Sequence, residues 1–481
     1  MKTSTSSASS FASVALRLAL GAPALTIGLT AVASSALVAC DDENEPKTWV
    51  KRLDDPAQRA GAIKRLTQFF EDDMTKANKN RDDPAVKGLL DEIVDPMTKQ
   101  YTAGNLDDKT RRELMKFLAD TRDPRTQPAL AKALGEYEPG KNEDDVKFAA
   151  NAVKGLAEAK KLTDQNVKDA LWNCFDKFQV SKTKMFELVK ALHDSVVAVA
   201  DPSYGPKAVG KLAPPVDPKN VDNVRDQLQF WQLTSVQLLG DLKYTAGIKP
   251  LVTVLLTPTK KDLQANVNTT LLKMAKDAEP VLITALNGSD PDFAKLEAGW
   301  ENKSYVAVVG DELATISRPA GRDAVLAALA AADNDTNRTV LAQALVKFPS
   351  DPRIVPAFLA AYKKLAPNTS IDMLGGANAH GILAQASAQF FDPTLTDWLV
   401  KEIAAAKGDE ADAMQLLALE SAIKLMTSAQ KGEVNAAVTK EGTPREKDMY
   451  TRAAAVLDKC NADAKCYVAV LDEPIPSSPP T

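Results

Sequence analysis

Residues 117–134 read FLADTRDPRTQPALAKAL, and this stretch decides the expected fold. It begins with an apolar helical end, continues through a polar turn, and finishes with apolar residues three and four positions apart. The turn contains Asp123-Pro124. Because Asp is a good N-cap and Pro is favoured at the first helical position, this dipeptide indicates the start of a helix. The stretch therefore predicts two helices joined by a short turn.

The same arrangement recurs along the chain. Residues 345–359, LVKFPSDPRIVPAFL, form a second copy, and residues 238–256 form a third that lacks the Asp-Pro dipeptide. A single helix pair cannot bury its apolar face alone, so we expect consecutive pairs to stack and share a core. Several Asp-Pro dipeptides are 40 or 41 residues apart. The dipeptide occurs nine times, beginning at Asp55, Asp83, Asp95, Asp123, Asp201, Asp217, Asp290, Asp351 and Asp392.

This pattern resembles the HEAT repeat family, including the HEAT-like repeats first named from phycobilisome lyases. The resemblance covers most of residues 50–470. It implies an all-α fold, namely an α-α superhelical solenoid of HEAT-like helix pairs. An Arm or tetratricopeptide array is a competing interpretation. The interval is nearer to roughly 40 residues than to the roughly 34 of tetratricopeptides, which disfavours the latter. An ordinary all-α domain with many Asp-Pro caps is the remaining alternative.

A proline-rich stretch divides the expected array. Residues 212–218, LAPPVDP, cannot form a helix interior, because each proline removes a backbone donor and clashes with the preceding turn. We therefore expect N-terminal HEAT-like repeats over residues 49–212 and C-terminal HEAT-like repeats over residues 219–473. Residues 474–481 hold four prolines and two serines, and are predicted to be a disordered Pro-rich tail.

Two further breaks are expected within the array. Residues 287–291, NGSDP, are a strong turn signal. Helix continuity also fails at residues 367–370, PNTS, and a new helix is expected from Ile371. A run of small residues over 375–381 contains His380, which we expect to pack between helices rather than line a pocket.

The N-terminus has the pattern of an export signal. Residues 1–39 contain no Asp or Glu, and their only charges are Lys2 and Arg17. Acidic residues follow directly after Cys40. A basic start, an apolar centre and small residues before a cut are typical of a secretory signal. A transmembrane helix is the alternative, since about 20 apolar residues can span a bilayer, although proline, glycine and hydroxyl side chains weaken it.

The sequence Leu37-Val38-Ala39-Cys40 also resembles the bacterial lipobox. In that family the cysteine thiol is diacylated and the signal is cut just before it. The resemblance implies that residues 1–39 are a lipoprotein signal peptide, that Cys40 is lipidated, and that residues 40–48 form a lipidated acidic leader. The chain is then expected in the bacterial cell envelope, lipid-anchored to the inner or outer membrane.

The other cysteines and the histidines suggest structural roles. Cys460 and Cys466 bracket NADAK, which in an oxidising compartment predicts a disulfide across a turn; two free thiols are the alternative. Cys174 lies in the apolar sequence LWNCF and is expected to be a buried packing residue. The chain has only two histidines, His193 and His380, which rules out a His-rich metal site.

Charge and motifs exclude several classes of function. The chain has 59 Lys and Arg against 64 Asp and Glu, whereas nucleic-acid-binding proteins usually carry a basic excess. No Gly-x-Ser-x-Gly, phosphate-binding Gly-Lys-Ser/Thr loop or His-Glu-x-x-His motif occurs. Residues 333–344 begin like a calcium loop, but Arg338 and Ala344 stand where Gly and Glu are needed. The sequence predicts no catalytic residue, no metal and no cofactor.

We therefore expect a non-enzymatic, membrane-anchored lipoprotein whose repeat surface serves as a protein-interaction scaffold. The expected partners are a protein of unknown identity and the membrane, reached through the lipid anchor; nucleic acid is not expected. The alternative is an enzyme, or an accessory or chaperone subunit of an envelope enzyme, built on the same array. Trp231, Trp300 and Trp398 are possible binding anchors, but in a chain this poor in aromatics we expect them in the core.

Overall fold

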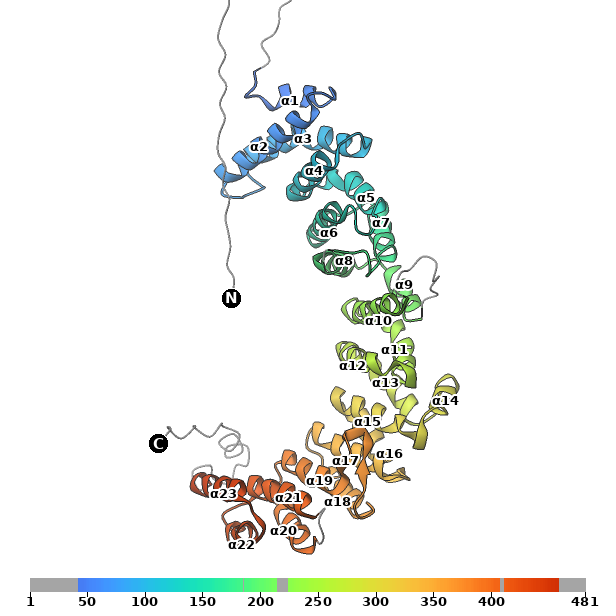
Figure 1. The fold of residues 1–481 in the computed structure, drawn as a ribbon, viewed down its shortest axis with the longest axis vertical. Coiled ribbons are helices and arrows are strands. Elements are labelled where there is room, and N and C mark those ends of the chain that lie inside the picture. The colour runs from blue at the N-terminus through green and yellow to red at the C-terminus, as the bar shows by residue number, and fades with distance from the viewer. Residues whose placement is uncertain (1–41, 185, 214–223, 407–410, 458–481) are drawn as a thin grey trace, which may run out of the picture.

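The computed structural model describes residues 42–184, 186–213, 224–406 and 411–457. In these ranges the helices stack side by side into an open arc (Figure 1), and each makes its main contacts with helices nearby in the sequence. An inner layer lies on the concave side of the arc and an outer layer on the convex side. The predicted all-α class is confirmed, whereas the assignment of the helix pairs to HEAT-like repeats stays a prediction.

The two layers alternate along the chain. The inner layer consists of α2 (Arg59–Lys76), α4 (Asp108–Thr121), α6 (Glu143–Glu158), α8 (Phe186–Val199), α10 (Val224–Asp241), α12 (Gln264–Lys273), α15 (Tyr305–Ile316), α17 (Asp335–Ala344), α19 (Ala379–Ser387), α21 (Ala411–Leu425) and α23 (Pro444–Val456). The outer layer consists of α1 (Pro46–Arg52), α3 (Pro84–Ala103), α5 (Gln127–Gly135), α7 (Gln165–Asp176), α9 (Tyr204–Lys211), α11 (Ile248–Leu255), α13 (Ala275–Leu286), α16 (Pro319–Ala331), α18 (Ile354–Lys363), α20 (Leu395–Ala405) and α22 (Lys431–Glu441). The short helix α14 (Pro291–Glu297) lies outside both layers, on the convex side.

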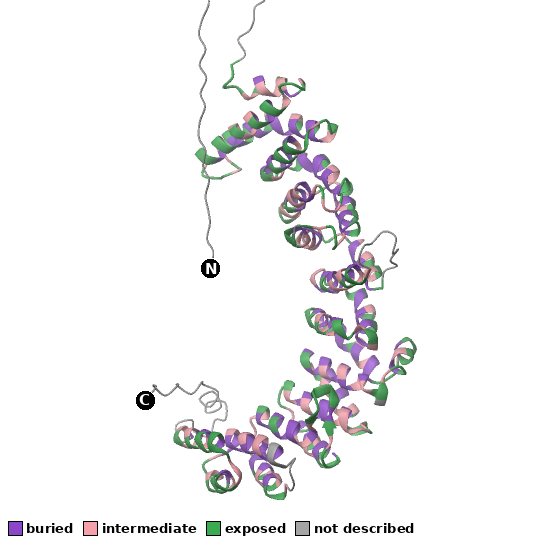
Figure 2. Ribbon diagram, viewed as in Figure 1, coloured by how far each residue is buried: buried purple, intermediate pink, exposed green. Residues whose placement is uncertain are grey.

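The core runs along the arc between the layers. Figure 2 shows buried residues where helices face one another and exposed residues on their outward sides. One buried apolar cluster extends from residue 53 to residue 386, and a second from residue 384 to residue 457. Helical periodicity produces this division: in α4, Leu114 and Leu118 are fully buried, while Lys116 is exposed. Burial of these apolar faces is the main force that holds consecutive pairs together.

The breaks that the sequence predicts have different outcomes. Residues 287–291 do separate two helices, because α13 ends at Leu286 and α14 begins at Pro291. Of the predicted boundary at residues 212–218, the structure describes only the first two residues. Trp231, which follows this stretch, belongs to the same buried cluster as the residues before it, so one core continues across the boundary.

The Asp-Pro dipeptide has a uniform local role at seven described turns. In each, the Asp carboxylate accepts a hydrogen bond of 2.9 Å from the backbone N–H two residues further on, which orders the turn that precedes or begins a helix. The seven are Asp55, Asp83, Asp123, Asp201, Asp290, Asp351 and Asp392. Some also bind a cation from an earlier helix: Lys249 of α11 lies 2.9 Å from Asp290, and Arg322 of α16 lies 3.1 Å from Asp351.

Asp95-Pro96 does not begin a helix, so that prediction is wrong. Pro96 lies inside α3, which continues from Pro84 to Ala103. An internal proline weakens a helix, but Val94 and Met97 beside it are fully buried, and this packing keeps the helix continuous. The dipeptide alone cannot distinguish a helix start from a proline tolerated in a packed helix. The interval from Asp55 to Asp95 is therefore not the length of a repeat.

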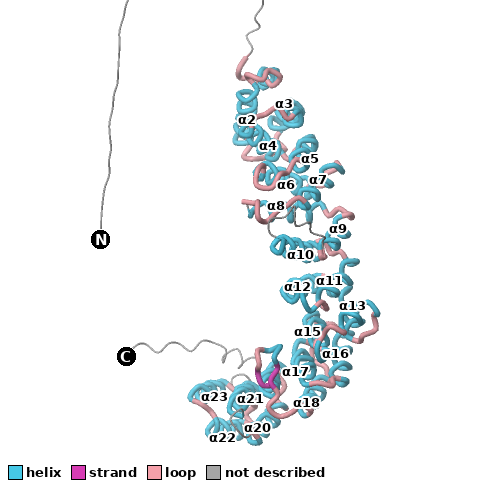
Figure 3. Tube along the Cα trace, turned by 45° about the vertical axis from the view of Figure 1, so that its right-hand side comes forward, coloured by secondary structure: helices cyan, strands magenta, loops and turns pink. Residues whose placement is uncertain are grey.

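The prediction of a new helix from Ile371 is also wrong. Instead, β1 (Ser370–Ile371) pairs with β2 (Ala377–Asn378) in an antiparallel hairpin, the magenta segment in Figure 3. Gly375 and Gly376 both have positive φ, at 71° and 79°, a conformation that glycine adopts without strain. The helix α19 begins only at Ala379, after the Asn378 side chain has capped it.

Candidate functional site: an apolar cleft between α8 and α10

The site residues that the sequence predicts lie outside the described residues. Cys40, Cys460 and Cys466 all fall there, so lipidation and the disulfide stay predictions. The same holds for the signal peptide over residues 1–39 and for the tail over residues 474–481. Across the part of the chain that is described, no helix combines the length and apolarity needed to cross a bilayer.

Cys174 and His380 both pack against neighbouring residues, as the sequence predicts. Cys174 in α7 is fully buried, and burial raises the pKa of its thiol, so the reactive thiolate is disfavoured. His380 in α19 packs edge-on against Tyr362, with ring centroids 4.7 Å apart. Burial lowers the pKa of His380, which favours its neutral form. Both residues therefore serve the packing of the array.

The tryptophans also belong to the core rather than to an exposed surface. Trp231 is only 8% exposed. Trp300 is partly buried, and its indole N–H donates to the Leu256 carbonyl at 2.7 Å. Trp398 packs edge-on against Tyr362, with ring centroids 4.8 Å apart. None of the three is an exposed anchor for a partner.

An apolar cleft of about 550 Å³ lies between the inner helices α8 and α10. We call it the α8–α10 cleft. It is lined by Phe178, Val180 and Thr183 of the α7–α8 loop, by Phe186, Val189, Lys190, His193 and Asp194 of α8, and by Phe230, Thr234 and Gln237 of α10. Phe186 is 87% exposed. The next most exposed large apolar side chain among the described residues is Leu272, at 46%. Apolar surface left open in this way is typical of an interaction site.

Aromatic packing forms part of the cleft lining. The rings of Phe178 and Phe230 stack with centroids 4.6 Å apart at 24°. Phe230 also contacts Phe175 of α7, at 5.9 Å between centroids. Because Phe175 and Phe178 belong to the buried core, this wall of the cleft is continuous with the fixed interior of the array.

The loop between α7 and α8 is fixed by two buried polar side chains. Gln227 of α10 is 1% exposed; it donates to the Phe178 carbonyl and accepts from the Val180 N–H, both at 2.9 Å. Glu143 of α6 is 6% exposed and accepts from the Lys184 N–H at 3.1 Å. Buried polar groups require such partners. These side chains therefore fix the loop wall of the cleft to both neighbouring inner helices.

Charged groups lie at the edge of the cleft. Asp194 of α8 lies 2.7 Å from the ammonium of Lys190 and 3.1 Å from that of Lys154 in α6. These hydrogen bonds, Lys190 first, hold the pKa of Asp194 below its usual value. Asp194 therefore stays ionised at neutral pH and is not suited to donate a proton.

A second connection crosses the cleft. His193 Nε2 of α8 lies 3.2 Å from Asp241 Oδ2, at the end of α10. Asp241 also lies 2.5 Å from the Lys273 ammonium, at the end of α12. Ion pairs therefore join α6 to α8 and α10 to α12, whereas His193 and Asp241 approach between α8 and α10 without forming a hydrogen bond. The apolar cleft remains open beside them.

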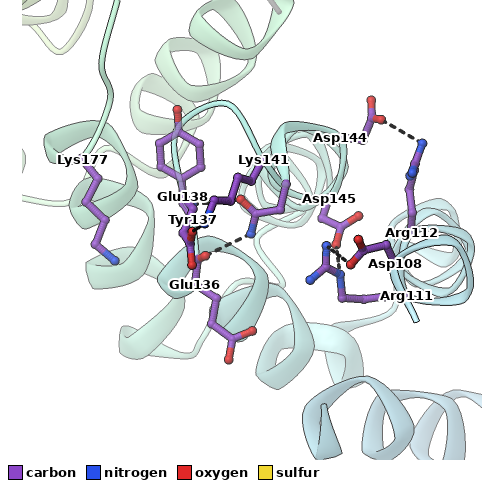
Figure 4. Close-up of a pocket in the computed structure, with 11 residues that line it drawn as sticks. Asp108, Arg111, Arg112, Glu136, Tyr137, Glu138, Lys141, Asp144, Asp145 and Lys177 are labelled. Carbon is purple, nitrogen blue, oxygen red and sulfur yellow. Dashed lines mark hydrogen bonds and ion pairs between the residues drawn. The ribbon is translucent and has the colours of Figure 1, made fainter. Parts of the chain in front are cut away.

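A polar hollow of about 560 Å³ lies between α4, the α5–α6 turn and the end of α7 (Figure 4). Asp145 is 2% exposed, and its Oδ2 lies 2.8 Å from Arg111 Nε and 3.4 Å from the Tyr101 hydroxyl, which donates to it. Burial raises the pKa of Asp145, although the Arg111 charge opposes this.

The remaining charges of the hollow are also paired internally. Arg112 lies 3.4 Å from Asp144, Lys141 pairs with Glu138, and Lys177 donates to the Gly135 carbonyl at 2.7 Å. Every basic side chain that lines the hollow thus has a partner within the chain. Because these contacts join α4 to α6 and α7 to α5, we interpret the hollow as a structural brace between consecutive units.

No protein-family model matches the chain, and no curated protein matches its sequence. Within the described ranges, no group of three or more His, Cys, Asp or Glu side chains is placed to hold a metal ion. The α8–α10 cleft, with the 87% exposed Phe186 at its edge, is the candidate binding site.

Sequence reasoning missed the α8–α10 cleft, although a signal is present in α8. Leu188 and Leu192 lie on one face of this helix and are buried. Phe186 and Val189 lie on a second face and line the cleft. A helix with two apolar faces needs two packing partners. The second apolar face of α8 therefore indicates, from the sequence, a surface that binds something.

Proposed function

We propose that the protein is a membrane-tethered scaffold that binds a partner protein at the α8–α10 cleft. The observation that carries this proposal is the open apolar cleft, with the 87% exposed Phe186 at its edge. Apolar clefts with a few polar groups at the edge are common binding sites. Curved helical arrays use their extended surfaces to bind other proteins.

The envelope location is part of the same proposal. It is supported by the likeness of residues 37–40 to a lipobox and by the signal-like composition of residues 1–39. Lipidation at Cys40 would hold the array at the inner or outer membrane of a bacterial envelope. HEAT-like repeats would then supply the surface and the lipid would supply the location.

The proposed role is binding without a chemical step. The acidic side chain at the cleft is Asp194, which Lys190 and Lys154 hold in its ionised form. The alternative of an enzyme or an accessory subunit would have to use His193 or the hydroxyls of Thr183 and Thr234, which also line the cleft, as proton donor or nucleophile. Binding accounts for the apolar lining directly.

The proposal is tested by placing a photo-crosslinking phenylalanine analogue at position 186 in living cells. A matched variant carries the analogue at Met373, which is 45% exposed at the tip of the β1–β2 hairpin. We expect one envelope protein to be captured from position 186 and not from position 373. We also expect Cys40→Ser to reduce this capture. Identical captured sets from both positions would contradict docking at the cleft.

A further inference from the structure

The charge of the cleft wall differs from that of the whole chain. Residues 178–194 contain three lysines and two acidic residues, a formal charge of +1 with His193 counted as neutral, whereas the chain carries −5. Lys182 and Lys184 are both exposed, and neither forms an ion pair with any described residue. These two lysines flank Thr183, which lines the cleft. The basic charge of this wall is therefore available to a partner.

The opposite wall does not cancel this charge. The described α10 residues that line the cleft, Phe230, Thr234 and Gln237, are uncharged, and Asp241 at the end of α10 is paired with Lys273 at 2.5 Å. On α8, Asp194 is bound by two lysines. The Glu143 carboxylate also lies at the loop, but it is buried and accepts from the Lys184 N–H, so Lys182 and Lys184 are the exposed charges of the loop that meet an incoming group. A partner with acidic residues would be attracted to this edge, and one with basic residues would be repelled.

The position of the cleft favours a protein over a membrane surface. Helices α8 and α10 belong to the inner layer, near the middle of the arc and on its concave side (Figure 1). A flat bilayer does not fit into a concave face, whereas a peptide segment can enter it. The volume of about 550 Å³ is enough for one or two large side chains rather than for a folded domain.

From these observations we infer that the cleft binds a protein segment in which a large apolar side chain is flanked by acidic residues. The apolar side chain enters between Phe186 and Phe230, and the acidic residues face Lys182 and Lys184. This inference rests on the proposed scaffold function and specifies the chemistry of its partner. The local charge at the cleft is opposite in sign to that of the chain.

The test uses synthetic 15-residue peptides and the purified full chain. One peptide carries a central Phe flanked by Glu, a second replaces each Glu by Lys, and a third replaces Phe by Ala. We expect the Phe/Glu peptide to bind at least tenfold more tightly than either of the others, and more weakly as salt is raised. Equal or tighter binding of the Phe/Lys peptide, or no binding of the Phe/Glu peptide, would overturn the inference.

Matched variants test whether Lys182 and Lys184 of the α7–α8 loop cause the preference for the Phe/Glu peptide. Lys182→Glu with Lys184→Glu should weaken the Phe/Glu peptide at least tenfold, whereas Lys363→Glu with Lys364→Glu, an exposed pair at the C-terminal end of α18, should leave its affinity unchanged. Equal losses in the two double variants would overturn the inference. So would binding to anionic phospholipid vesicles that depends on Lys182 and Lys184 while the Phe/Glu peptide fails to compete.

Crosslinking separates this inference from the scaffold proposal. If position 186 captures a partner segment that is basic, the partner chemistry is wrong while docking at the cleft stands. If position 186 captures no protein that position 373 does not, both are wrong. Capture of an acidic segment with an apolar centre, whose synthetic copy shows the same dependence on Lys182 and Lys184, supports both.

Discussion

The junctions on the two sides of α8 differ in how closely the helices approach. On one side α8 packs along α6 through small, fully buried residues, and the Ser195 hydroxyl donates to the Ala150 carbonyl at 2.6 Å. On the other side α8 meets α10 over a much shorter length, and the aromatic side chain of Phe230 lines the space between them. Small side chains let backbones approach, and large ones hold them apart. The candidate binding surface thus arises where packing between inner helices stops.

The largest expected effect concerns a buried carboxyl in another closed part of the array. α15 is packed between α13 and α17, and Glu312 within it is fully buried, with no hydrogen-bond partner for either carboxyl oxygen among the described residues. Burial raises the pKa of Glu312 to about 8. A closely packed junction should therefore disfavour an ionised side chain, whereas the open α8–α10 cleft should not.

The raised pKa of Glu312 determines how the free energy of unfolding changes with pH. Between pH 4.5, the ordinary value for Glu, and about pH 8, the unfolded chain loses a proton that the folded chain keeps. The free energy of unfolding should therefore fall as pH rises through this window, by about 1.4 kcal/mol per pH unit. Glu312→Gln should remove this fall, whereas Glu158→Gln, at an exposed position, should not. Chemical denaturation across pH measures both; the same slope in both variants would contradict the prediction.

The second effect concerns the loop that forms the wall of the open junction. Gln227→Ala leaves the Phe178 carbonyl and the Val180 N–H without their partner, and each loss costs about 1–3 kcal/mol. We expect the free energy of unfolding to fall by about 2–4 kcal/mol and amide exchange at Val180 to accelerate. Gln229→Ala, at an exposed position on the same helix, is the control. Unchanged exchange at Val180 would show that something else holds the loop.

The third prediction compares a leucine substitution at the α6–α8 junction with one at the α8–α10 cleft. Ala150→Leu adds volume where α6 and α8 are already in contact, and should reduce the free energy of unfolding by about 1–3 kcal/mol. Thr234→Leu adds volume at the α8–α10 cleft, and should change it by less than about 1 kcal/mol while weakening the crosslink from position 186. Thermal unfolding of the two variants compares them directly. Equal destabilisation would mean that the cleft closes in solution.

The sequence was sufficient for the class of fold and for most of its turns. Helical periodicity around Asp123 and Asp351 identified helix pairs that the structure contains, because a turn and its two flanking helices are determined locally. It failed at Pro96, since packing from distant residues decides whether a helix survives a proline. It failed again at the β1–β2 hairpin, where the paired residues are too short a pattern to distinguish from a loop.

The cleft was harder to predict for a related reason. Whether a second apolar face such as that of Phe186 and Val189 is covered depends on how closely α10 approaches, which the sequence of α8 does not contain. The bidentate contact of Gln227 with the loop joins residues 49 apart in the chain and has no local signature. Features that depend on the spacing between units therefore required the structure.

The smallest expected effect tests whether packing or ion pairing closes the junction between α6 and α8. Lys154 and Asp194 join these helices at 3.1 Å, but both side chains are partly exposed, so their attraction is screened by water and salt. A double-mutant cycle with Lys154→Ala and Asp194→Ala should give a coupling energy of about 0.5 kcal/mol, and less in 1 M salt. The cycle of Lys273→Ala and Asp241→Ala, beyond the open cleft, should give a similar value. If the first coupling were several times the second, ion pairing rather than small buried side chains would explain why the junction between α6 and α8 is closed.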